Sequence, residues 1–177
     1  MSCYVYADYS NVWIEGMHVS AVAKKMAQNI LDAQQQDICD KAWRIDFGKL
    51  YVFSGGNDIS SARLYGSRPP PNDSLWDAAR KKGFEPVIFD RNFFNKEKKV
   101  DTQITADIME DLYEKIKKGD EITLLAGDAD FVPVCEKAKK RGVNFDVAFW
   151  DHAAKELKAT ASNFVSLNQF LDHLKLK

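Results

Sequence analysis

The segment Ile122–Phe131 limits the possible folds of this chain more than any other. Its first half is an apolar run, which is typical of a buried strand. Gly127 ends the run, and two carboxylates, Asp128 and Asp130, follow at once. A helix is predicted to begin there, because apolar residues recur at helical spacing from Phe131 onward. Either acid can cap that helix, but this position is also where open α/β sheets bind ligands.

Strand-like and helix-like patterns alternate through most of the chain. The predicted strands lie at residues 3–7, 47–53, 85–90, 122–126, 145–150 and 164–167. The predicted helices lie at residues 21–35, 73–82, 100–117, 153–160 and 169–174, with one more beginning at residue 131. Such alternation indicates the α/β class, with a mainly parallel sheet between two helical layers. We expect one domain over residues 1–177.

The composition excludes little. The chain has 25 Lys and Arg against 26 Asp and Glu, so its net charge neither favours nor excludes nucleic acid. Cys3 and Cys135 lie in apolar runs and are predicted to be reduced core residues. Neither a signal peptide nor a membrane span is recognisable, so a cytoplasmic protein is expected. The three histidines stand apart in the sequence, and each is expected at the surface: His18, His152 and His173.

Four aspartates are candidates for one acidic site. Asp8 follows the first predicted strand, and Asp128 and Asp130 follow a later one. The carboxyl ends of parallel strands share one edge, so these acids meet if their strands are neighbours. Asp101 lies in the first turn of a predicted helix whose apolar residues recur every fourth position, and its side chain is predicted to face the sheet. A charge there requires pairing, hydrogen bonding or a metal.

The chemistry of this acidic set favours a hard cation. Crowded carboxylates raise one another's pKa unless a cation is present, and oxygen ligands suit Mg²⁺ or Mn²⁺. No His and Cys set with zinc spacing is recognisable, and Gly55-Gly56 lacks the rest of a phosphate-binding loop. This combination points to metal-activated water attacking a phosphodiester. Asp107 lies off the apolar axis of its helix and is expected to be solvated.

Several segments in order resemble NYN domains, a PIN-like nuclease group that includes LabA-type proteins. The resemblance rests on residues 8–11 (DYSN), 64–67 (LYGS), 83–84 (GF), 98–101 (KKVD) with Asp107 following, and 126–133 (AGDADFVP). It spans nearly the whole chain. Three departures are visible. Residues 161–164 read ASNF where many members carry an aspartate, Lys99 replaces a common glycine, and the first helix region, with Gln34 to Asp37, matches no family pattern.

The resemblance implies a three-layer, Rossmann-like α/β/α fold of the PIN type and RNA cleavage dependent on Mg²⁺ or Mn²⁺. It places Asp8, Asp101, Asp128 and Asp130 in the metal cluster, as the catalytic residues. It also implies that Asn11 steadies the first turn or contacts the substrate.

Other side chains are candidates for RNA contacts. Residues 91–99 interleave aromatic and basic side chains, and the candidates there are Arg91, Phe93, Phe94, Lys96, Lys98 and Lys99. A solvated loop with two aromatics in the core is the alternative. Tyr65 and Arg68, before a run of three prolines, are further candidates.

Two other functions are compatible with parts of this pattern. A non-catalytic NYN module that binds RNA or a protein would retain the same acids. A haloacid-dehalogenase-type phosphatase is disfavoured, because it needs a D-x-D motif after the first strand, where this chain has Asp8-Tyr9-Ser10. Homodimerisation is left open by the sequence.

Overall fold

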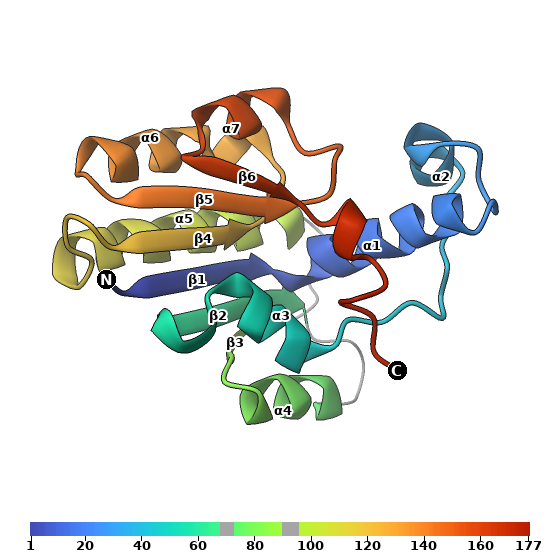
Figure 1. Ribbon diagram of the computed structural model, residues 1–177, viewed down its shortest axis with the longest axis horizontal. Coiled ribbons are helices and arrows are strands. Elements are labelled where there is room, and N and C mark those ends of the chain that lie inside the picture. The colour runs from blue at the N-terminus through green and yellow to red at the C-terminus, as the bar shows by residue number, and fades with distance from the viewer. Residues whose placement is uncertain (68–72, 90–95) are drawn as a thin grey trace.

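The computed structural model describes residues 1–67, 73–89 and 96–177, and for residues 96–98 it describes the backbone alone (Figure 1). The strands are β1 (Cys3–Asp8), β2 (Ile59–Ser67), β3 (Glu85–Phe89), β4 (Glu121–Leu125), β5 (Asn144–Phe149) and β6 (Asn163–Ser166). The α-helices are α1 (Tyr9–Ala23), α2 (Ile30–Gln35), α3 (Phe47–Ser54), α4 (Ser74–Lys81), α5 (Lys96–Glu114), α6 (Val132–Lys140) and α7 (Lys155–Thr160). Short 3₁₀ helices are η1 (Gly56–Asp58), η2 (Ala129–Phe131) and η3 (Asn168–Phe170).

The six strands form one sheet in the order β3-β2-β1-β4-β5-β6, and every neighbouring pair is parallel. The chain therefore winds outward from β1 in one direction and then returns to build outward from β4 in the other. This reversal between β1 and β4 is the topological switch point, where doubly wound sheets form a crevice beyond the strand ends. In the register of this pair, Ala7 lies opposite Leu125. Asp8 and the segment after β4 thus leave the sheet side by side.

Helices cover both faces of the sheet, as expected from the sequence (Figure 1). Helix α5 packs against β1 and β2 and contacts α6, which in turn contacts α7. The apolar residues that recur every fourth position are all buried: Val100, Ile104, Ile108 and Leu112 on α5, and Ile116 just after its end. Their burial anchors the helix and fixes the direction in which its first turn points. In the described part of the chain, no helix has both the length and the apolar character required to cross a membrane.

Three predicted elements are wrong. Residues 47–53 form helix α3 and not a strand, because the Asp46 side chain caps the segment by accepting from Lys49 N–H, and Phe47 and Leu50 are buried at helical spacing. The segment predicted as one helix at 21–35 contains the end of α1 and all of α2. The final segment contains only the short helix η3.

Gly16 explains part of this difference. A glycine is often a sign of a helix end, yet Gly16 lies inside α1, where an added Cβ would be 2.4 Å from the Trp43 ring and 2.8 Å from the Trp150 ring. Both indoles are buried and pack edge to face. The glycine therefore lets two large side chains approach the helix backbone, and it does not end the helix.

Candidate functional site

The turn after β4 positions the acidic pair Asp128 and Asp130. Gly127 comes directly after Ala126 at the strand end, and a Cβ there would lie 2.3 Å from the Phe149 ring, so only glycine fits. The Gly127 carbonyl accepts from Ala154 N–H at 2.8 Å. Asp128 then caps η2, its carboxylate accepting from Asp130 N–H at 3.0 Å. The two acids are thus held in a fixed turn beyond the sheet.

Helix α5 contributes the third acid. Carboxylate oxygens of Asp101, Asp128 and Asp130 all lie within 4.8 Å of one another. Asp101 is half-buried, and the other two acids are exposed. A shallow hollow of about 440 Å³ adjoins them, lined by Asp101, Thr102, Thr105, Ala106 and Asp130. Asp101, Asp128 and Asp130, called the acidic triad below, lie near the switch point of the sheet.

The acidic triad suits a divalent cation of the hard type. Carboxylates at this spacing repel one another, and a cation would relieve that repulsion. Mg²⁺, Mn²⁺ and Ca²⁺ all take carboxylate oxygen ligands, and the hollow beside Asp101 and Asp130 is open to a ligand. The donor set therefore fits the ion that the sequence predicts.

Asp8 lies at a neighbouring strand end but is not a member of the acidic triad. It ends β1, is 7% exposed, and its carboxylate accepts from Asn11 N–H at 3.1 Å to cap α1. Within the part of the chain that the structure describes, the group of acids within 4.8 Å of one another does not include Asp8. It occupies the neighbouring strand end, so the predicted four-acid site consists of a triad with a fourth acid next to it.

The predicted substrate-binding residues differ in their surroundings. Tyr65 is fully buried, and its hydroxyl donates to Asp107 at 2.7 Å, which gives it a structural contact in the core. Asn11 is half-buried on the first turn of α1, and Lys99 is exposed beside the triad residue Asp101 on α5. The remaining candidates lie outside the described side chains: Arg68, Arg91, Phe93, Phe94, Lys96 and Lys98.

Asp107 and Asp111 form a second polar network that the sequence analysis missed. The prediction that Asp107 is solvated is wrong, because its side chain is 14% exposed and accepts from Tyr65 and Gln103. Asp111 is 1% exposed, accepts from the Tyr6 hydroxyl at 2.6 Å and pairs with Arg63 at 3.0 Å. The spacing of four residues between Asp107 and Asp111 on one helix was the sequence signal that could have indicated this network.

Two of the three histidines also depart from their predicted surface positions. His18 on α1 is 5% exposed. His152 is half-buried and contacts Glu15 at 2.6 Å. His173 is exposed, as expected. Cys3 and Cys135 are buried thiols, as expected, and burial raises the pKa of each to about 11.

Comparison with known proteins gives one family and one fold. The family model of the NYN domain matches residues 2–168. A crystal structure of a protein of unknown function from Vibrio parahaemolyticus superimposes with a TM-score of 0.70 and 18% sequence identity, covering 99% of this chain and 96% of that chain. At this identity the likeness shows the fold alone. No curated protein matches the sequence.

Proposed function

Because this chain belongs to the NYN-domain family, with its nuclease-like fold, we propose that it is a ribonuclease dependent on Mg²⁺ or Mn²⁺. The observation that carries the proposal is the acidic triad Asp101, Asp128 and Asp130, three carboxylates from two separate segments within 4.8 Å of one another. It lies near the switch point, where this class of sheet binds its ligands.

The triad would hold the divalent ion. When bound, such an ion supplies an activated water and neutralises charge on the scissile phosphodiester. Asp8, at the adjacent end of β1, adds negative charge to the same edge and supports Asn11 through its cap. Lys99 is exposed and lies two residues before Asp101, which supports a contact between Lys99 and the RNA backbone. The hollow beside Thr102 and Thr105 gives a phosphate room to approach the triad.

A cleavage assay tests this proposal. Purified protein is incubated with a labelled single-stranded RNA in Mn²⁺, in Mg²⁺ and in EDTA. We expect cleavage in either metal, none in EDTA, and a loss of at least about a hundredfold in Asp128→Asn, because removing one ligand of a catalytic ion removes most of its binding. RNA that stays intact with the wild-type protein in both metals contradicts the proposal.

Asp58→Asn is the matched control. Asp58 is exposed and directly precedes β2, so it lies at the edge of the sheet opposite the triad. The substitution removes the same charge without touching the proposed site. Cleavage by Asp58→Asn should equal that of the wild type, and equal losses in both variants would show a general charge effect.

A non-catalytic RNA-binding module is the second candidate. It is favoured by the position of Asp8, which caps α1 and is not a member of the triad. Such a module would bind the labelled RNA with equal affinity in metal and in EDTA and leave it intact. The cleavage assay and a binding titration on the same samples distinguish the two functions.

A further inference from the structure

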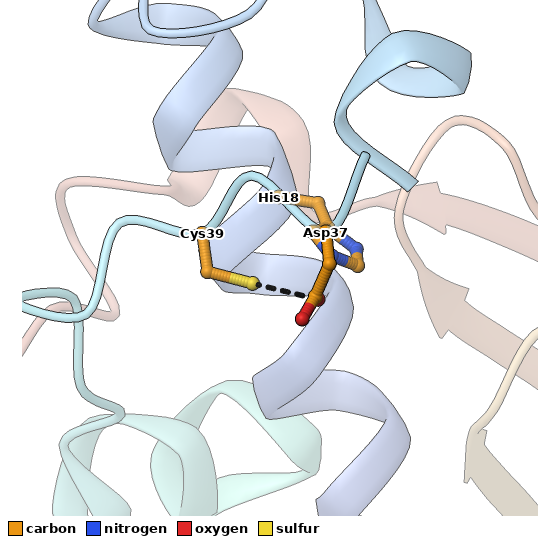
Figure 2. A group of neighbouring side chains, drawn as sticks. All are labelled: His18, Asp37 and Cys39. Carbon is orange, nitrogen blue, oxygen red and sulfur yellow. Dashed lines mark hydrogen bonds and ion pairs between the residues drawn. The ribbon is translucent and has the colours of Figure 1, made fainter. Parts of the chain in front are cut away.

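A second group of potential ligands lies far along the chain from the acidic triad. His18 extends from α1, and Asp37 and Cys39 extend from the loop that follows α2 (Figure 2). One ligand atom from each residue lies within 4.8 Å of the others. In Figure 2 the side chains of Asp37 and Cys39 point toward one another, with the His18 ring beside Asp37.

The His18 imidazole has an unusual environment. The residue is 5% exposed, yet neither ring nitrogen has a hydrogen-bond partner within the described residues. The nearest carboxylate oxygens are those of Glu15, 3.5 Å from Nδ1, and of Asp37, 3.6 Å from Nε2. Burying polar atoms without hydrogen bonds is unfavourable, so an unobserved partner for Nε2 would stabilise this arrangement.

The distances suit a tetrahedral metal ion. Ligand atoms bound at about 2.0–2.3 Å from Zn²⁺ lie about 3.3–3.8 Å from one another in a tetrahedron. The contact from His18 Nε2 to Asp37 Oδ1 is 3.6 Å, and that from Cys39 Sγ to Asp37 Oδ1 is 3.5 Å. Two edges of such a tetrahedron are therefore already present. A set of one nitrogen, one sulfur and one oxygen favours Zn²⁺ over Mg²⁺.

The surroundings also orient the histidine. Glu15 lies one turn before His18 on α1, and its Oε2 faces Nδ1. Gln34 and His152 contact that same oxygen at 2.9 Å and 2.6 Å, which fixes the carboxylate. A carboxylate on one ring nitrogen and a metal on the other is the common arrangement of metal-binding histidines, because it fixes the tautomer and the ring direction.

The loop that carries the other two ligands is anchored against α1. Asp40 is buried, accepts from Ser20 at 2.6 Å and pairs with Lys24 at 2.7 Å, and its N–H donates to the Met17 carbonyl. Asp37 adopts φ +51, a left-handed conformation that is uncommon outside glycine. The loop thus returns to α1 with little freedom, so the ligands are held near His18 before any metal binds.

We propose that His18, Asp37 and Cys39 form a Zn²⁺ site that fastens the loop after α2 to α1. Binding would convert the Cys39 thiol to a thiolate, with its proton released to solvent. Three protein ligands leave a fourth position, and the Asp37 side chain is 90% exposed, so water can occupy it. The site is independent of the proposed nuclease activity, since it shares no residue with the acidic triad.

Cobalt substitution tests the site directly. Chelator-treated protein is titrated with Co²⁺ and then with Zn²⁺, and thiolate-to-cobalt charge-transfer absorption is recorded. We expect a band that saturates at one equivalent and disappears on addition of Zn²⁺. Cys39→Ser should abolish the band, whereas Cys135→Ser, which alters a buried thiol on α6, should retain it. A band that persists in Cys39→Ser, or no band in the wild type, overturns the proposal.

Two further variants test the site without changing Cys39, whose side chain is half-buried. Asp37→Asn changes an exposed side chain and should weaken Zn²⁺ binding, measured by competition with a chromophoric chelator. Glu15→Gln should weaken it roughly 10- to 100-fold, as loss of an orienting carboxylate does. Asp128→Asn should leave the cobalt band unchanged. Affinity for Zn²⁺ that is equal in the wild type and in Asp37→Asn would contradict the role of Asp37 as a ligand and overturn the three-residue site.

Discussion

Three aspartates on helix α5 have the same side chain and quite different surroundings. Asp101 joins the acidic triad, Asp107 accepts from Tyr65, and Asp111 accepts from Tyr6 inside the protein. Burial by itself would raise the pKa of the Asp111 carboxyl. The hydrogen bond from Tyr6 and the charges of the nearby cations outweigh burial, so the pKa of Asp111 is lowered. Asp111 is therefore a charged, structural residue, whereas Asp101 is a half-buried member of the acidic triad.

Replacing Asp111 tests this structural role. Asp111→Asn removes the charge opposite Arg63 and weakens the bond to Tyr6 in a buried setting. We expect a loss of about 1–3 kcal/mol in the free energy of unfolding at pH 7, measured by urea denaturation. Asp172→Asn, at an exposed position, should change stability by less than about 0.5 kcal/mol.

The lowered pKa of Asp111 predicts that the stability difference between the wild type and Asp111→Asn depends on pH. A carboxyl whose pKa is lowered by folding contributes stability above its unfolded pKa, about 3.9, and that contribution is lost as the pH falls through the folded value. The stability difference between wild type and Asp111→Asn should therefore be full at pH 7 and shrink below about pH 4. A difference that is constant between pH 7 and pH 3 would contradict this assignment.

At the scale of elements, sequence patterns succeeded where one periodicity was clear. The apolar residues of α5 recur every fourth position without competing signals, and the helix lies where they predict. Residues 47–53 carry a short apolar run that fits a strand or a helix equally, and the cap from Asp46 decided for the helix. Strand β2 was missed because Ser60, Ser61 and Arg63 interrupt its apolar residues.

The acidic site was predictable for a related reason. Each acid follows a recognisable strand or begins a recognisable helix, so topology alone places all four near one edge. Contacts between side chains could not be predicted in this way, because they depend on packing between distant segments. Neither the pairing of Arg63 with Asp111 nor the position of His18 beside Asp37 and Cys39 has a local sequence signal.

The turn from β4 to η2 makes a prediction of its own. Gly127→Ala would place a Cβ 2.3 Å from the Phe149 ring, so the turn or the ring must shift. We expect a loss of about 1–3 kcal/mol in stability, and weaker metal binding because Asp128 and Asp130 move with the turn. The double variant with Phe149→Leu should recover part of both losses, and a purely additive result would show that the contact is unimportant.

The strand order of the whole sheet brings the three residues of the acidic triad together. Asp101 lies 27 residues before Asp128 in the sequence, and the strand order places α5 and the end of β4 at one edge of the sheet. Mutual repulsion of the triad in the folded state is the consequence of that arrangement. A divalent ion that binds there stabilises the native fold, because the unfolded chain separates the carboxylates.

Thermal unfolding with and without Mn²⁺ measures that linkage most directly. An ion at a hundred times its Kd adds about 2.7 kcal/mol, which corresponds to a rise of roughly 5–10 °C in Tm for a chain of this size. The rise should be lost in Asp128→Asn and retained in Asp58→Asn, which alters an exposed carboxylate at the opposite edge of the sheet. Asp128→Asn should cost the metal-free protein little, since one repelling charge is removed. A Tm in millimolar Mn²⁺ that equals the Tm in EDTA, or an equal rise in Asp128→Asn, would contradict the claim that the acidic triad binds a divalent ion.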